Sequence, residues 1–339
     1  MPQAAADSSP IVHLLTMGGT IAATLEGSDG YTARLGAAAL LPAHPALAGI
    51  AIRPADFTRE QSFGVTFQTA RRLVARLTEL LAEPEVRGVA ITHGTAVMEE
   101  VAYLCDLTLT SPKPVVFTGA MYHASDPGPD GPHNVADAIR VAVAPEARGR
   151  GAMVCFAGEI HAARDVMKLH KQSPSPYVSP GGPLGAIDAG GVIFYREATA
   201  RTTLPFPPLP LPRVEVIKAV MDMDDMLLQA AIGAGAMGLV IEGFPGGGGV
   251  PPSLLPGLRQ AVERGIATVL TARSPFGRMT PVAAGESGPR VLEKMGLLIA
   301  GDLPAHKARL LLVLALGNGR TLEELRALFA QVSRAGRIA

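Results

Sequence analysis

IVHLLTMGGTIAA, residues 11–23, begins with a short, mostly apolar run that is followed by two glycines and a threonine. The run from Ile11 to Leu15 predicts a buried β-strand. Gly18 and Gly19 permit a tight turn that leaves backbone N–H groups open to a ligand, with the Thr20 hydroxyl directly behind them. Because ligands bind beyond the carboxyl ends of the strands in open α/β sheets, this loop is a candidate site.

The same alternation of strand and helix continues along the first 200 residues. Such a rhythm is typical of a parallel sheet covered by helices on both faces. The expected strands after the first are residues 89–92, 114–118 and 152–156, and the expected helices are residues 67–81, 97–107 and 134–144.

A proline-rich stretch from Leu204 to Pro212 separates this region from a second one. Repeated prolines exclude both a helix and a central strand, so the stretch predicts an extended linker. The alternation resumes at Val214. We therefore expect an α/β protein with a larger N-terminal domain at residues 1–200, a linker at residues 201–213 and a smaller C-terminal domain at residues 214–339.

The composition excludes several classes of protein. The chain has 339 residues, a formal net charge of +0 and no tryptophan, which argues against nucleic acid, anionic membranes and stacked bases as partners. Cys105 and Cys155 lie in apolar runs and are interpreted as buried thiols. The first ten residues lack the pattern of a secretory signal, and no apolar run is long enough to span a membrane, so a cytoplasmic location is expected.

A second loop, Thr92-His93-Gly94-Thr95, follows another expected strand and again places a hydroxyl at the start of a helix. Such a hydroxyl either caps the helix or takes part in chemistry. In chain order the sequence holds GGTIA, THGT followed by MEE, FTGAM, ARDVMK and GLLIAGDL. Together these motifs, which span nearly the whole chain, resemble the bacterial-type L-asparaginase and glutaminase family.

The resemblance implies an asparaginase-like fold and cleavage of a carboxamide without metal or cofactor. It implies that Thr20 is the nucleophile, that Tyr31 assists from a mobile loop, and that Thr95 works with Lys168 as a second proton-transfer pair. A threonine hydroxyl needs such a base within reach before it attacks. The resemblance also implies a homodimer or homotetramer whose sites are shared between subunits. Five further positions are expected to contact the small-molecule substrate: Gly19, Gln61, Ser62, Gly94 and Ala96, the last through a backbone N–H that could hold an oxyanion.

The sequence departs from the family pattern around the substrate's amino group. Ala96 stands where the family has an aspartate, and residues 246–249 are four glycines where the family has an asparagine from a neighbouring subunit. The family's glutamate from the same domain falls near Pro289, with Glu286 close by. Losing the carboxylate would leave a substrate ammonium unpaired, so we expect a substrate without a free α-amino group. Lys168, without a neighbouring carboxylate, is expected to have a lowered pKa.

Other interpretations stay open. A non-catalytic relative that binds a small molecule would also explain the missing aspartate, and an ammonia-supplying subunit of an aminoacyl-tRNA amidotransferase is less favoured because no basic surface is evident. His93 is expected to be a structural hydrogen-bonding group, and Glu99 and Glu100 to stabilise a helix start, with an inward turn of one of the two glutamates as the alternative. Residues 122–133 lack metal-ligand spacing. The four glycines form either a flexible loop or a point of close backbone approach.

Overall fold

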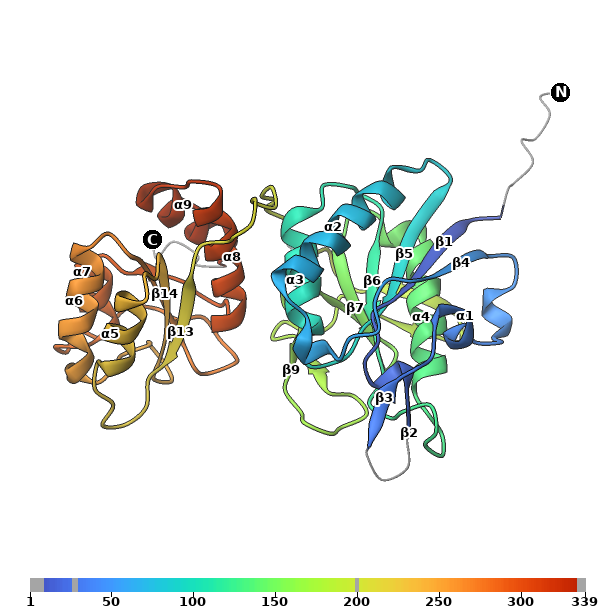
Figure 1. The fold of residues 1–339 in the computed structure, drawn as a ribbon, viewed down its shortest axis with the longest axis horizontal. Helices are drawn as coiled ribbons and strands as arrows, with labels where there is room; N and C mark the ends of the chain where they lie inside the picture. The colour runs from blue at the N-terminus through green and yellow to red at the C-terminus, as the bar shows by residue number, and fades with distance from the viewer. Residues whose placement is uncertain (1–8, 26–29, 199–200, 334–339) are drawn as a thin grey trace. The chain divides into compact units, whose positions relative to one another are not determined.

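A computed structural model describes residues 9–25, 30–198 and 201–333 (Figure 1). The chain forms two compact units, Met1–Thr203 and Leu204–Ala339. Residues 201–213, all of which the structure describes, contain neither helix nor strand. Within the described residues, no helix is long and apolar enough to cross a membrane. Cys105 and Cys155 are buried free thiols, as predicted, and burial raises the pKa of both.

The N-terminal unit is built on an eight-stranded sheet in the order β12-β11-β8-β7-β6-β5-β1-β4. Five neighbouring strands, β7, β6, β5, β1 and β4 in sheet order, pair in parallel, as the alternating pattern predicts. The sheet as a whole is mixed, however, because β8, β11 and β12 extend it with antiparallel pairs. These short strands follow turns rather than crossover helices, and strand–helix alternation therefore does not predict them.

Helices cover both faces of this sheet (Figure 1). Helix α2 contacts α3, while α1 contacts α4, and the two pairs lie on opposite faces. Buried residues of α4 pack against strands of the sheet to form one continuous apolar cluster that includes Val12, Ala90, Val116 and Ile139. Because both faces are covered, β1, β5 and β6 are buried along nearly their whole length.

The four strands and three helices predicted for the N-terminal unit lie within three residues of the observed ranges, whereas its other strands and helix α1 were not predicted. The strands are β1 (Ile11–Thr16), β2 (Ala23–Leu25), β3 (Tyr31–Ala33), β4 (Ala51–Asp56), β5 (Val86–Thr92), β6 (Val115–Thr118), β7 (Ala152–Phe156), β8 (Glu159–Ala162), β9 (Met167–Lys168), β10 (Tyr177–Val178), β11 (Gly185–Asp188) and β12 (Gly191–Phe194). The helices are α1 (Ala37–Leu40), α2 (Phe67–Ala82), α3 (Met98–Thr108) and α4 (Gly131–Val143), with a 3₁₀ turn η1 at Thr20–Ala22.

The C-terminal unit has a four-stranded parallel sheet in the order β13-β14-β15-β16. Its core gathers apolar side chains from α5, α6 and the sheet, among them Leu228, Ile241, Leu258 and Leu270. The strands are β13 (Val214–Lys218), β14 (Gly238–Gly243), β15 (Ala267–Ala272) and β16 (Leu298–Ile299), and the helices are α5 (Met226–Gly233), α6 (Leu255–Glu263), α7 (Pro289–Met295), α8 (Ala305–Gly317) and α9 (Leu322–Val332).

Candidate active site

The two glycine-containing loops meet at the carboxyl ends of β1 and β5, which are neighbouring parallel strands. Gly19 has φ +82, and a Cβ atom there would lie 2.2 Å from Gly94 Cα. No other residue fits such a contact, because an added Cβ would overlap the opposite backbone and strain the left-handed conformation. The contact brings the loops that carry Thr20 and Thr95 against each other.

Thr95 forms the best-defined polar pair of this region. The Lys168 Nζ atom donates a hydrogen bond to Thr95 Oγ1 at 2.7 Å. Lys168 lies on β9, far from Thr95 in the sequence, so the pair depends on the fold rather than on local structure. Burial lowers the pKa of the Lys168 ammonium below its usual value. A lysine with a lowered pKa is deprotonated in a larger fraction of molecules at a given pH, and only the neutral amine can act as a general base.

Glu99 turns into the site instead of serving only the helix start. Its carboxylate Oε2 accepts a hydrogen bond from the backbone N–H of Lys168. Its negative charge raises the pKa of Lys168 and so opposes the larger effect of burial. The expectation that Lys168 has no neighbouring carboxylate is therefore wrong. The lowered pKa comes from burial and not from the absence of an acid.

Tyr177 is a site residue that sequence reasoning missed. It lies opposite Lys168 in the antiparallel pair of β9 and β10. Its buried hydroxyl donates a hydrogen bond to the Thr95 carbonyl oxygen at 3.1 Å, and burial raises its pKa well above the usual value. Tyr177 and Lys168 thus hold Thr95 at its carbonyl and its hydroxyl from one short ribbon. The only sequence signal was a lone tyrosine beyond the lysine motif in a proline-rich segment.

Ser62 reaches the same loop and changes the assignment made for Ala96. The buried Ser62 Oγ accepts the backbone N–H of Ala96 at 3.2 Å, so this N–H already has a partner and is not available as expected for an oxyanion. A Cβ atom on Gly94 would lie 2.6 Å from Ser62 Oγ, which places Ser62 directly against the glycine. Gln61 points elsewhere, because its Nε2 donates to the Tyr31 carbonyl oxygen at 3.5 Å.

Thr20 and Tyr31 occupy the other side of the glycine contact. Thr20 opens η1 and is partly buried. Tyr31 lies on β3 and is 49% exposed, and its ring packs on His123 with the ring centroids 3.8 Å apart. Within residues 9–25, 30–198 and 201–333, no hydrogen bond joins the Thr20 side chain to Tyr31, Thr95 or Lys168. The structure brings together Thr95, Lys168 and Ser62 more closely than it does Thr20 and Tyr31.

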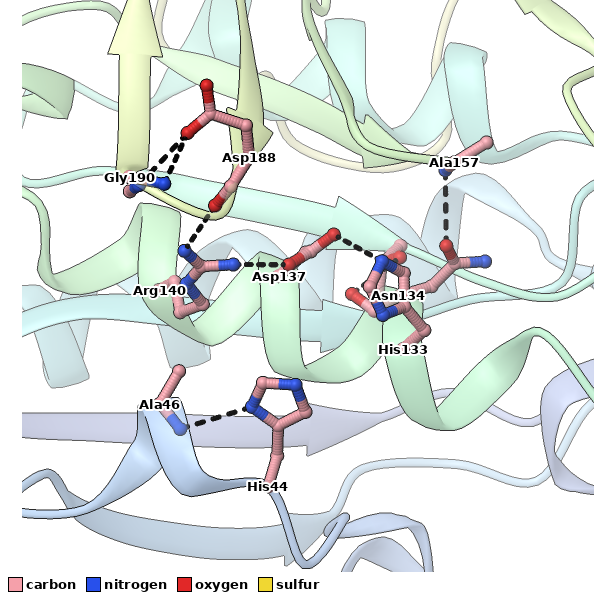
Figure 2. Close-up of polar contacts among 11 residues, drawn as sticks. His44, Ala46, His133, Asn134, Asp137, Arg140, Ala157, Asp188 and Gly190 are labelled. Atoms are coloured by element: carbon pink, nitrogen blue, oxygen red, sulfur yellow. Dashed lines mark hydrogen bonds and ion pairs between the residues drawn. The ribbon is translucent and has the colours of Figure 1, made fainter.

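Polar groups near this region have structural partners. His93 Nδ1 lies 2.7 Å from the Gly94 carbonyl oxygen, and complete burial lowers the pKa of His93 to about 4, so the ring is neutral. In α4, Asn134 accepts the Ala157 N–H, while Asp137 pairs with Arg140 (Figure 2). Among the described residues, no group of three or more His, Cys, Asp or Glu side chains is arranged to hold a metal ion.

The four glycines of the C-terminal unit form a tight loop after β14. The Phe244 N–H donates to the Gly249 carbonyl oxygen, and the Gly248 N–H donates to the Phe244 carbonyl oxygen. Gly248 has φ +83, and a Cβ atom on Gly243 would lie 2.3 Å from the Gly248 carbonyl oxygen. Of the two interpretations left open, the structure supports close backbone approach. Pro289 is buried at the start of α7, and Glu286 is exposed.

Comparison with known proteins agrees with this architecture. The family model "Asparaginase, N-terminal" matches residues 11–200, and the "Glutaminase/Asparaginase C-terminal domain" matches residues 213–329. A probable L-asparaginase of Deinococcus radiodurans is 36% identical over 330 residues, which cover 96% of this chain and 98% of the relative. L-asparaginase 2 of Bacillus subtilis is 32% identical and covers 94% of this chain and 86% of the relative. The crystal structure of a probable cytoplasmic L-asparaginase from Campylobacter jejuni superposes with a TM-score of 0.84 at 30% identity, covering 95% and 99% of the two chains.

Proposed function

Since this chain belongs to the asparaginase family, we propose that it hydrolyses the C–N bond of a carboxamide through Thr20, on a substrate without a free α-amino group. The observation that carries the proposal is the 2.7 Å hydrogen bond between Lys168 Nζ and Thr95 Oγ1, made by a lysine whose pKa is lowered. A protein that only binds a small molecule has no need of such a pair, so the enzymatic interpretation is the stronger one.

In the proposed reaction, the Thr20 hydroxyl attacks the carboxamide carbon and gives up its proton as the new C–O bond forms. Tyr31 assists, and the Thr95–Lys168 pair moves protons, because neutral Lys168 can accept one through the Thr95 hydroxyl. The C–N bond then breaks and the nitrogen leaves as ammonia with the transferred proton. Water attacks the resulting ester, which releases the carboxylate product and restores Thr20.

The oxyanion needs a donor other than Ala96, whose N–H is held by Ser62 Oγ. Among the described residues, the backbone N–H of Thr95 has no hydrogen-bond acceptor. We assign the developing negative charge to this N–H, since a donor with no partner loses nothing when it turns to the substrate. The Tyr177 hydrogen bond to the carbonyl of the same residue keeps its peptide groups in place.

The substrate proposal follows from charge balance around Ala96. Its methyl group offers no counter-ion to an α-ammonium, and the Gly243–Gly249 loop of the C-terminal unit carries no carboxylate or amide side chain in place of the one expected there. An unpaired ammonium in a partly buried site costs several kcal/mol, on the order of a 10²–10³-fold loss, whereas a substrate without the ammonium is not penalised.

A substrate panel tests this proposal. Ammonia release is measured from asparagine, glutamine and simple carboxamides, and release of the carboxylic acid from lactams and esters, with the same enzyme preparation. We expect the amides without an α-amino group to be preferred, and we expect Ala96→Asp to shift the preference toward asparagine by about ten- to a hundredfold, the value of one restored charge pair. Rapid asparagine turnover with a micromolar KM would refute the substrate proposal, while full activity of Thr20→Ala would refute the nucleophile.

The location and assembly are proposed as well. By resemblance to the family, we propose a cytoplasmic homodimer or homotetramer in which each site is shared between subunits, with no nucleic-acid or membrane partner. The relatives differ in named location: one is a probable cytoplasmic L-asparaginase from Campylobacter jejuni, and another is a probable periplasmic L-asparaginase of Haemophilus influenzae. Light scattering of the purified protein, together with fractionation of cells that express it, tests both statements.

A further inference from the structure

The C-terminal unit contains a cavity that the proposed reaction does not use. Its volume is about 560 Å³, within the size range of small-molecule sites. It is formed by the segment that follows β15, by α7, by Ile299 of β16 and by α9. Its lining includes the charged side chains of Arg278, Arg290, Glu293, Lys294 and Arg326, together with Ile299.

Positive charge is concentrated around this cavity. Three arginines and one lysine line it against a single carboxylate, that of Glu293, although the whole chain has a formal net charge of +0. Concave surfaces lined by one sign of charge focus the electrostatic field and attract ligands of the opposite sign. The local excess is therefore a property of this site and not of the protein as a whole.

Most of these cations are not neutralised inside the protein. Among the residues that the structure describes, the side chains of Arg290 and Lys294 take part in no hydrogen bond or ion pair, and neither does the Glu293 carboxylate. Arg326 donates only to the carbonyl oxygen of Gly296, at 3.3 Å, which leaves its charge without a counter-ion. Arg278 also interacts with other groups of the protein and is a secondary contributor.

Two of the cations lie on the short helix α7. Arg290 and Lys294 are four residues apart, so their charges lie on the same face of this short helix and repel each other. Arg326 approaches from α9, through its contact with Gly296 at the end of α7. An anion held between the two helices would relieve this repulsion.

Apart from Thr280, the remaining lining is apolar. Met279, Pro281, Val282, Ile299 and Ala330 complete the wall, which gives the cavity an apolar side next to a cationic one. We propose that this cavity binds a small organic polyanion that carries two or more phosphate or carboxylate groups beside an apolar part. Guanidinium groups suit both kinds of group, since their paired N–H donors match the oxygen atoms of either.

Isothermal titration calorimetry on the full-length protein tests the proposal with ADP and pyrophosphate as phosphate probes and with citrate as the carboxylate probe. The charge-removing variant is Arg290→Ala/Lys294→Ala. Its matched control is Arg259→Ala/Arg264→Ala, which removes two exposed cations of the same unit outside the cavity. Thermal unfolding of all three proteins with and without each probe gives a second measurement.

We expect at least one probe to bind the wild type and the control equally. The cavity variant should bind it at least tenfold more weakly, about the effect of one lost charge-assisted hydrogen bond. Comparing the phosphate probes with citrate identifies the anionic group, and a preference for ADP over pyrophosphate demonstrates use of the apolar wall. Equal weakening in the control, or no binding of any probe to the wild type, would overturn the proposal. Because binding is measured without turnover, its failure is distinct from failure of the amidohydrolase proposal.

Discussion

In each unit, a pair of glycines lets two backbone segments come into close contact at the end of a parallel strand. In the N-terminal unit a Cβ on Gly19 would lie 2.2 Å from Gly94 Cα, and in the C-terminal unit a Cβ on Gly243 would lie 2.3 Å from the Gly248 carbonyl oxygen. The first contact brings together two loops that carry threonine hydroxyls. The second closes a loop that carries glycines alone at residues 246–249.

The two contacts share a backbone geometry and differ in the side chains around them. Both contacts depend on a missing Cβ, but around the first the fold adds the Lys168 hydrogen bond and the Ser62 contact. Close backbone packing therefore occurs in both units, whereas the candidate reactive side chains lie only around the Gly19–Gly94 contact of the N-terminal unit. Variants that remove a side chain at the first loop should affect turnover, and variants that crowd the second loop should affect stability.

The largest expected effect comes from Lys168→Met, which keeps the length of the side chain and removes the amine. We expect kcat to fall by about 10²–10⁴, the usual contribution of a positioned proton-transfer group. Lys171→Met, in the same segment but exposed, is the matched control and should retain wild-type turnover. Steady-state ammonia release decides, and a Lys168→Met enzyme with near-normal kcat would exclude Lys168 from proton transfer.

Crowding the second contact gives the next largest effect. Gly243→Ala should lower the free energy of unfolding by about 1–3 kcal/mol, because the new methyl group meets a backbone oxygen that has little room to move. The kcat of the folded enzyme should stay unchanged. Gly233→Ala, where a Cβ meets nothing within 4 Å, is the control and should be neutral or slightly stabilising. Chemical denaturation beside activity measures both, and a lost kcat in a stable Gly243→Ala enzyme would show that this loop takes part in the reaction.

Sequence patterns predicted the alternating parallel strands and helices of the fold. Strand β7 and helix α2 fall within one residue of the expected ranges, because an apolar run determines the strand locally, and apolar periodicity and the Thr66 cap determine the helix. The antiparallel β8, β11 and β12 were missed, and so were the hairpin β2–β3 and the pair β9–β10. These strands have two to four residues each, too few for a period of two to stand out.

The site was predictable only where a motif carried it. Thr95 and Lys168 were identified from the family resemblance. Their 2.7 Å hydrogen bond could not be predicted from local sequence patterns, because 73 residues separate them. Glu99 was assigned to the helix start, since an acid in a first turn is usually explained by the macrodipole. Its inward turn depends on the short strand β9, which places the Lys168 N–H against it.

Glu99→Gln tests the electrostatic part of this network. A glutamine oxygen can still accept the Lys168 N–H, so the substitution removes the charge and keeps the hydrogen bond. Because Glu99 raises the pKa of Lys168, its neutral replacement should lower that pKa further. The rise of kcat with increasing pH should then occur at lower pH than in the wild type. An unchanged profile beside Glu100→Gln, its neighbour in the same first turn, would show that Glu99 is structural only.

The smallest effect is expected for Tyr177→Phe, which removes the hydroxyl that donates to the Thr95 carbonyl oxygen at 3.1 Å. The lost hydrogen bond costs about 1 kcal/mol of stability, and kcat should fall less than tenfold because Lys168 still holds the Thr95 hydroxyl. KM should change less than kcat, since the ring stays packed and only the placement of Thr95 loosens. Tyr195→Phe, on a 64% exposed tyrosine, is the matched control. If both variants have the same kcat and the same unfolding midpoint, Thr95 is held by Lys168 alone, and the ribbon of β9 and β10 supports the site from one point instead of two.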